Sequence, residues 1–213
     1  MSTPNSPEEI SPFTPTDLHL PKLIIGEGVE EVLVFEAVLS HLELTDVGVE
    51  HYGGKQKLAA YLDVLKLRPG FAQLASLGVT RDADESAIGA FASVQSLLQK
   101  RQFVIPNTPG DITEGSPRVG IIILPDGVNN GALEDLCLAA WREDPLLQCI
   151  DAYFDCVSTA KGEPPRQISK ARVHAWLAAQ GTPDMRLGIA AKKGLIDWNN
   201  PAFERLVTFI KAL

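Results

Sequence analysis

The sequence predicts an α/β fold in which helices flank a parallel four-stranded sheet and a C-terminal helical extension follows. Short apolar segments alternate with amphipathic segments up to about residue 140, a pattern typical of right-handed βαβ units. Glycine and proline residues separate these segments, as expected for turns. From Gly131 onward the apolar spacing is almost entirely that of helices.

The first four elements follow from their apolar spacing. Residues 22–26 are a short apolar run that predicts a buried strand, and residues 29–42 place apolar side chains three and four positions apart, as a helix does. Residues 46–52 alternate apolar and polar side chains, which indicates a second strand. Residues 55–66 follow a Gly-Gly pair, carry leucines on one side and predict a second helix.

The third and fourth strands are expected over residues 74–80 and 119–124, the latter being the most apolar strand of the chain. Between them, Ser86 is a suitable N-cap for a helix that reaches about Arg101. Residues 104–118 are rich in Pro and Gly and predict a long loop. The remaining expected elements are helices over residues 132–141, 145–158, 168–179 and 201–212 and a weak strand over residues 187–190.

Three regions are expected along the 213 residues, with one substantial core. Residues 1–20 hold four prolines and no Lys or Arg, which predicts a disordered tail and argues against a signal peptide. Residues 21–140 form the α/β domain, and residues 141–213 form a helical extension packed on that same domain. No apolar run reaches the ~18–20 residues needed to cross a bilayer, so we expect no membrane contact and a cytoplasmic location.

Charge is distributed unevenly within a formal net charge of −8. Residues 1–160 contain 10 Lys and Arg against 23 Asp and Glu, whereas residues 161–213 contain 9 against 4. The overall acidity disfavours non-specific nucleic-acid binding, while the basic end could face a polyanion or dock onto the acidic domain. Three cysteines without a C-x-x-C pair indicate small buried residues rather than disulfides: Cys137, Cys149 and Cys156.

Acidic residues follow the predicted strands at the positions where an open parallel sheet gathers its ligands. Glu27 follows the first strand, Asp82 and Asp84 follow the third, and Asp126 follows the fourth. Two carboxylates in D-x-D spacing on an extended segment point the same way, so both could reach one hard cation. Glu31 lies four residues after Glu27, on the same face of the next helix.

Each of these acids also has a structural interpretation. The D-x-D pair before Ser86 could serve a turn and a helix cap, and Glu27 could favour the positive end of a helix dipole. Clustered carboxylates repel one another, however, and a site that assembles them usually holds a cation. The combination at several strand ends therefore favours a metal site over separate structural roles.

The motif Ile24-Ile-Gly-Glu27-Gly28-x-x-Glu31, followed by a strand ending in Asp82-x-Asp84, resembles the Toprim domain. That domain is the metal-dependent fold of topoisomerases, primases and OLD-type nucleases, and the E-G-x-x-E spacing resembles the OLD-type branch. Tyr52-Gly-Gly-Lys55 and Gly131-Ala-Leu-Glu134-Asp135-Leu136 are similar to stand-alone Toprim-like proteins of unassigned function. The resemblance covers roughly residues 20–140.

The resemblance implies roles for individual residues and a Mg²⁺ or Mn²⁺ cofactor. Glu27 matches a general acid/base or metal ligand, and Asp82 and Asp84 match the metal-binding aspartates. Glu31 matches the additional acid of two-metal OLD-type sites, and Glu134 is a further expected ligand by a looser match. Two departures are visible: Gly26 stands where the family usually has an aliphatic or small residue, and no ATPase motif G-x-x-x-x-G-K-[ST] is present.

Basic and glycine residues complete the expected site. The resemblance implies a downstream catalytic lysine, for which Lys192 and Lys193 are candidates by position, although a surface-exposed lysine pair is the commoner explanation. Gly53, Gly54 and Lys55 could bind a phosphate through backbone N–H groups and one ammonium, or could form a plain strand-to-helix turn.

Two functional hypotheses follow. The first is a Mg²⁺-dependent phosphodiester-cleaving enzyme, nuclease-like, that acts on nucleic acid or a nucleotide. The second is a non-catalytic metal- or nucleotide-binding module that works with a partner protein or as a homo-oligomer, in keeping with the missing ATPase and the overall acidity. A third possibility is an α/β domain whose acids are ordinary surface residues.

Overall fold

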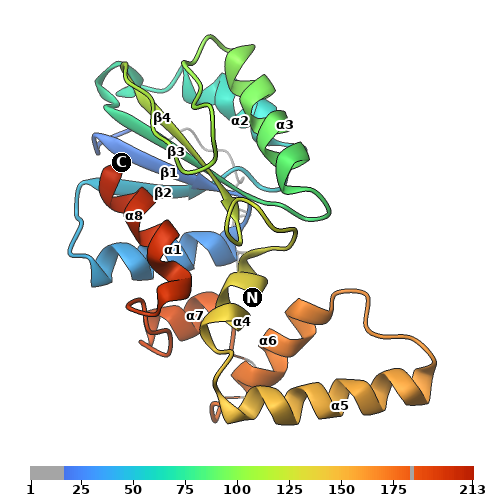
Figure 1. Cartoon of the computed structure of the whole chain (residues 1–213). Coiled ribbons are helices and arrows are strands. Elements are labelled where there is room, and N and C mark those ends of the chain that lie inside the picture. Colours follow the sequence, from blue (N-terminus) through green and yellow to red (C-terminus); the bar gives the residue numbers. More distant parts are fainter. Residues whose placement is uncertain (1–16, 183–184) are drawn as a thin grey trace, which may run out of the picture.

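A four-stranded, all-parallel sheet forms the centre of the protein, in a computed structural model that describes residues 17–182 and 185–213. The strand order is β2-β1-β3-β4 (Figure 1). The strands are β1 Lys22–Gly26, β2 Val47–His51, β3 Ser76–Asp82 and β4 Arg118–Leu124. The predicted α/β class and the four predicted strands are confirmed.

Eight α-helices are formed by the described residues, and none of them has the length and apolarity that a bilayer-spanning helix requires. Two short 3-10 helices accompany them, η1 Phe71–Gln73 and η2 Pro201–Phe203. The α-helices are α1 Val29–His41, α2 Leu58–Leu65, α3 Ala87–Gln99, α4 Leu133–Ala140, α5 Pro145–Lys161, α6 Ile168–Ala178, α7 Leu187–Lys192 and α8 Glu204–Ala212.

The prediction of a weak strand over residues 187–190 is wrong, because these residues lie in α7. A short apolar run does not distinguish a strand from a buried helix turn. In this protein, contacts with α1 accompany the helical conformation. The Gly188 N–H donates to Glu30 at 2.8 Å, and a Cβ at Gly188 would lie only 2.3 Å from Leu33. Close contact with α1 therefore fixes this segment as a helix.

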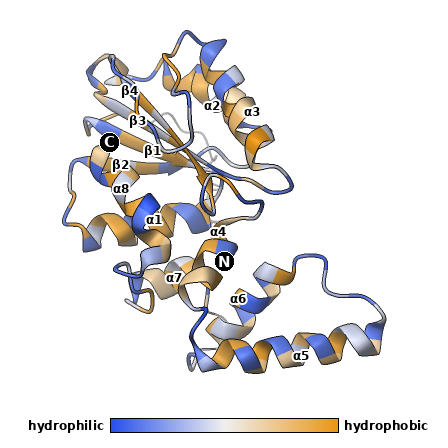
Figure 2. Cartoon of the chain, viewed as in Figure 1, coloured by the Kyte–Doolittle hydropathy of each residue, from blue (hydrophilic) through white to orange (hydrophobic). Residues whose placement is uncertain are grey.

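Helices cover both faces of the sheet, as a parallel sheet requires (Figure 1). α2 and α3 lie on one face, and α1 and α8 lie on the other. Side chains alternate accordingly: Leu23 and Ile25 of β1 join the core under α2 and α3, whereas Ile24 joins the core under α1 and α8. Apolar residues concentrate along the strands (Figure 2).

Glycines in β3 and in the neighbouring edge strand β4 let α8 approach the sheet closely. Gly78 and Gly120 are register partners in β3 and β4. A Cβ at Gly120 would lie 2.6 Å from the Phe209 ring, and one at Gly78 would lie 3.0 Å from Leu213. The absence of side chains at these positions therefore creates the space that α8 fills.

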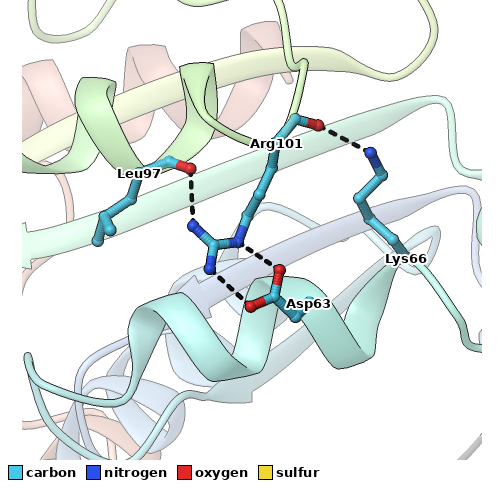
Figure 3. A network of polar contacts seen from close by, with 4 residues as sticks. All are labelled: Asp63, Lys66, Leu97 and Arg101. Carbon is cyan, nitrogen blue, oxygen red and sulfur yellow. Dashed lines mark hydrogen bonds and ion pairs between the residues drawn. The ribbon is translucent and has the colours of Figure 1, made fainter.

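A polar network ties α2 to the end of α3 (Figure 3). The Arg101 guanidinium donates to both carboxylate oxygens of Asp63, at 2.8 and 2.6 Å, and to the Leu97 carbonyl at 3.0 Å. The Lys66 ammonium donates to the Arg101 carbonyl at 2.7 Å. These contacts hold α2 against the C-terminal end of α3 on the outer side of the sheet.

The helical hairpin α5–α6 extends away from the sheet and is anchored at its base (Figure 1). The Trp141 and Trp176 rings stack at 3.8 Å, and the Trp176 indole donates to Asp144 at 2.8 Å. Only Leu147 and Ile150 of α5 are buried. The expected burial of the cysteines is therefore confirmed for Cys137 in α4 but wrong for the two on α5, Cys149 and Cys156, which are exposed.

Most of the expected N-terminal tail, residues 1–16, lies outside the described residues. Within the part that is described, the Leu18 N–H donates to the Pro69 carbonyl at 2.9 Å. The segment directly before β1 is thus held against the turn that precedes η1. At the other end, α7 and α8 contribute Leu187, Ala190 and Phe209 to the core that also contains Ile24 of β1.

Replacing Gly120 with Ala should destabilise the fold, because the new methyl group would overlap the Phe209 ring. We expect Gly120→Ala to lower the free energy of unfolding by about 1–3 kcal/mol in urea denaturation. Gly48→Ala is the matched control, because a Cβ at this position in β2 has its nearest neighbour, Leu23, at an ordinary 3.5 Å. An equal effect of both substitutions would contradict the close packing of α8.

Candidate functional site

The carboxyl end of the sheet gathers four of the predicted acidic residues. β1 and β3 are neighbours at the centre of the sheet, so Glu27, directly after β1, and Asp82, the last residue of β3, lie at the same edge. Glu31 lies in the first turn of α1, and Glu134 lies in the first turn of α4 after β4. Electrostatic interactions connect Asp82 to the other three carboxylates.

Glu31 is the most deeply buried of these acids, with 4% of its surface exposed. Its carboxylate accepts hydrogen bonds from the Gly28 N–H at 2.8 Å and from the Thr80 hydroxyl at 3.2 Å. Burial raises the pKa of Glu31 to about 7, and repulsion by Glu27 adds to the rise. The bond to Gly28 also makes Glu31 part of the capping box of α1, so it has a structural role as well.

Asp82 is held in a similar way against α4. Its carboxylate accepts the Leu133 N–H at 3.0 Å, at the first residue of that helix. Burial raises the pKa of Asp82 to about 8, with further rises from repulsion by Glu31, Glu134 and Glu27 in that order. A partly buried carboxylate with three acidic neighbours favours either a proton or a cation.

Glu27 is positioned by the loop after β2. Its backbone carbonyl accepts the Gly53 and Gly54 N–H groups at 3.1 and 2.9 Å, and its Oε1 accepts the Lys55 N–H at 3.3 Å. Its Oε2 is buried and has no hydrogen-bond partner among the described residues. One buried acceptor of the site is therefore unsatisfied.

The glycine pair adopts a backbone that favours glycine, with φ values of 79° at Gly53 and 105° at Gly54. The Gly53 and Gly54 N–H groups, which we predicted to bind a phosphate, donate to the Glu27 carbonyl instead. The role of Gly53, Gly54 and Lys55 in phosphate binding stays a prediction. The structure shows that the loop fixes the backbone of Glu27.

Asp84 lies at the exposed rim of the site. Its carboxylate pairs with the Lys55 ammonium at 3.0 Å, and its backbone forms a two-bond bridge with Gly131, at 2.8 and 2.9 Å. The expectation of an extended D-x-D segment is wrong at this residue, because Asp84 has a φ of 51°, in the left-handed region. Asp82 and Asp84 nevertheless line the same cavity.

Two lysines contact the acidic residues, and neither is the predicted downstream pair. Lys55 pairs with Asp84, and Lys170 of α6 pairs with Glu134 at 3.4 Å. Lys192 instead pairs with Glu36 in the middle of α1, at 2.6 Å, and Lys193 is exposed. The catalytic role proposed for Lys192 and Lys193 has no contact in support of it.

A cavity of about 300 Å³ opens beside these carboxylates. Acidic residues line one side, and the segment leading into α6 lines the other. Sequence reasoning missed this second side, because only the folded hairpin brings it opposite the sheet. The lining residues are Asp82, Asp84, Gly131, Ala132, Glu134, Asp135, Arg166, Gln167, Ile168, Ser169 and Lys170.

Gly26 departs from the Toprim pattern for a local steric reason. A Cβ at this position would lie 3.0 Å from the Glu31 Cβ and 3.1 Å from its Oε2. A side chain before Glu27 would therefore displace the buried carboxylate. The glycine preserves the position of Glu31 rather than disrupting the site.

The donor chemistry suits a divalent cation. Carboxylate oxygens are the ligands that Mg²⁺ prefers. The unsatisfied Oε2 of Glu27 belongs to the same group of acids as Glu31 and Asp82, whose pKa values are raised. As the side chains are oriented, no three His, Cys, Asp or Glu residues in the described part of the chain form a ready metal site. Glu31 and Asp82 face backbone N–H groups instead, so side-chain rotation would accompany metal binding.

Comparisons with known proteins agree with this fold. The hypothetical protein PH0156 from Pyrococcus horikoshii OT3 is similar in structure, with a TM-score of 0.58 and 20% identity over 90% of this chain and 94% of that one. The C-terminal region of the Xanthomonas campestris pv. campestris OLD protein reaches a TM-score of 0.39 and 12% identity over 92% and 87%, too weak to bear on function.

A comparison with curated proteins gives no match. The family model described as "Protein of unknown function (DUF3226)" matches residues 21–213, which include the whole sheet, the acidic site and the α5–α6 hairpin. The chain therefore belongs to the DUF3226 family.

Proposed function

We propose that this protein is a Toprim-type, Mg²⁺- or Mn²⁺-dependent enzyme that cleaves phosphodiester bonds. The observation that carries the proposal is the group of four carboxylates at one sheet edge, two of which have pKa values raised to about 7 and about 8. Burying like charges together costs stability, and a cation would offset that cost. The E-G-x-x-E and D-x-D motifs, which resemble those of Toprim enzymes, support the same assignment.

Glu27, Glu31 and Asp82 are the proposed ligands of the first cation. Glu134 and the rim residue Asp84 are the proposed ligands of a second. Bound Mg²⁺ would stabilise charge on phosphate oxygens and supply a water of lowered pKa. Since Glu27 has an unsatisfied oxygen, it is also the proposed group that takes a proton from the attacking water.

Positive charge lies close enough to the acids to orient a substrate phosphate. Lys55 and Lys170 each pair with one carboxylate of the site, at 3.0 and 3.4 Å. A cation that binds Asp84 or Glu134 would release the ammonium group from its partner. Each lysine could then donate to a non-bridging phosphate oxygen.

The activity is tested by incubating the protein with plasmid, single-stranded DNA and RNA in the presence of Mg²⁺ or Mn²⁺. We expect cleavage that Asp82→Asn reduces by more than about 100-fold, because the substitution removes a ligand charge while keeping its size. Glu85→Gln is the matched control and should keep its activity, since Glu85 is an exposed acid three positions away. If the wild-type protein cleaves no faster than the Asp82→Asn variant, the proposal is wrong.

The charge cluster should also be visible in stability without divalent cations. The folded protein holds the protons of Glu31 and Asp82 to about pH 7 and about pH 8. The stability supplied by protonation is thus complete below their unfolded pKa values and lost as the pH rises through these folded values.

Asp82→Asn should therefore be more stable than wild type near about pH 9 in EDTA, by at least about 1 kcal/mol, and the difference should shrink near about pH 5. Asn can still accept the Leu133 N–H, so the helix contact is preserved. Urea denaturation at both pH values measures the effect, with Glu85→Gln as the control. A variant less stable than wild type at the higher pH would show that Asp82 is not under repulsion.

One observation favours the alternative, a metal- or nucleotide-binding module without turnover. Glu31 and Asp82 already accept backbone N–H groups at helix starts, so they have structural roles without a metal. Calorimetry against Mg²⁺, nucleotides and short oligonucleotides separates the two candidates. Nucleotide binding without cleavage of any strand favours the module, and cleavage favours the enzyme.

A further inference from the structure

Three basic side chains lie along the side of α6 that faces the acidic site. Lys170 and His174 are four residues apart in the helix and so share one face, and Arg166 lies in the turn just before it. Arg166 and Lys170 line the cavity that contains Asp82. Lys170 and His174 line a second cavity of about 210 Å³.

The two cavities are adjacent and share one ion pair. Both are lined by Glu134 and Lys170, whose charged groups lie 3.4 Å apart. The second cavity continues to Arg186, before α7. A ligand extending from the acidic cluster along α6 would therefore pass Arg166, then Lys170, then His174.

The partners of these basic groups argue for a ligand rather than for a purely structural role. In the described part of the chain, the structure gives Arg166 and His174 no ion-pair partner, and both are exposed. Arg172, on the same helix but outside both cavities, pairs with Asp151 at 2.7 Å. Arg166 and His174 thus line the cavities without an ion-pair partner among the described residues, whereas Lys170 between them pairs with Glu134.

The length of this row indicates the kind of anion. Lys170 and His174, four residues apart in the helix, are separated by about 6 Å along its axis, and Arg166 in the preceding turn extends the row beyond that spacing. One phosphate group is too small to contact both ends, whereas a chain of linked phosphates can. Cavities of a few hundred Å³ hold nucleotide-sized groups, which favours a single strand over a duplex.

We propose that this face of α6 binds the backbone of a single-stranded nucleic acid and leads it past the acidic cluster. The inference deepens the proposed function, on which it rests for the chemistry, by naming the substrate class. Because the chain has a net charge of −8, general attraction to nucleic acid is weak. Affinity should then depend on this local row.

The test measures binding apart from cleavage. A fluorescein-labelled single-stranded oligonucleotide is titrated in EDTA with protein carrying Asp82→Asn, and anisotropy reports the affinity. Arg166→Gln with His174→Gln should weaken binding by about tenfold and reduce the salt dependence by about one unit, for the lost Arg166 charge. Arg172→Gln is the matched control on the same helix and should change the affinity by less than about twofold.

Several outcomes would overturn the inference: equal affinity of all variants, tighter binding of a duplex of the same sequence, or equal competition by a mononucleotide. Because no divalent cation is present, a failure of the cleavage assay leaves this binding result intact. Conversely, cleavage that persists in the Arg166→Gln/His174→Gln protein at unchanged KM would overturn the inference and leave the proposed function standing. Thermal melts of each variant confirm that the exposed substitutions preserve the fold.

Discussion

Repulsion among four carboxylates, one buried and three partly buried, is the constraint around which the carboxyl end of this sheet is organised. Burial raises the pKa of Glu31 and of Asp82, and repulsion by the neighbouring carboxylates adds to the rise at both residues. The surrounding chain offsets part of the cost with backbone donors: Gly28 to Glu31 and Leu133 to Asp82. The two helices that follow β1 and β4 thus begin at the acidic site.

Glycines permit this arrangement at close quarters. Gly26 leaves room for the Glu31 side chain, and the Gly53-Gly54 turn brings two N–H groups to the Glu27 carbonyl. On one face of the same sheet, Gly78 and Gly120 admit α8. The acidic edge is therefore supported by a rigid, closely packed scaffold, which is what a site with precise ligand geometry needs.

The sequence predicted the parts of the protein that follow from local rules. Apolar periodicity located the strands, and the position of acids after strands identified Glu27 and Asp82 as neighbours, since parallel strands end at one edge. What it missed depends on tertiary contacts. The helical state of residues 187–190 is set by packing on α1, and the left-handed backbone of Asp84 accompanies its bridge to Gly131.

The lysines that contact the acidic residues also depend on tertiary packing, and the catalytic role of Lys192 and Lys193 stays a prediction. Sequence distance favoured Lys192, but α7 packs along α1 and directs it to Glu36, while the α5–α6 hairpin brings Lys170 to Glu134. No local sequence pattern predicts that the α5–α6 hairpin folds back toward the acidic site, because its anchor is a long-range stack between Trp141 and Trp176. The basic C-terminal region is thus divided between contacts that hold the fold and a row that faces the cavities.

A crystal structure of the wild-type protein soaked in Mn²⁺ tests the central claim most directly, because the anomalous signal of the ion locates it independently of the protein atoms. We expect an ion coordinated by both Glu27 and Asp82, with the Asp82 carboxylate turned away from Leu133. Coordination of Mn²⁺ elsewhere, or carboxylates that keep their backbone hydrogen bonds at saturating Mn²⁺ with no ion between them, would contradict a metal centre at this edge of the sheet.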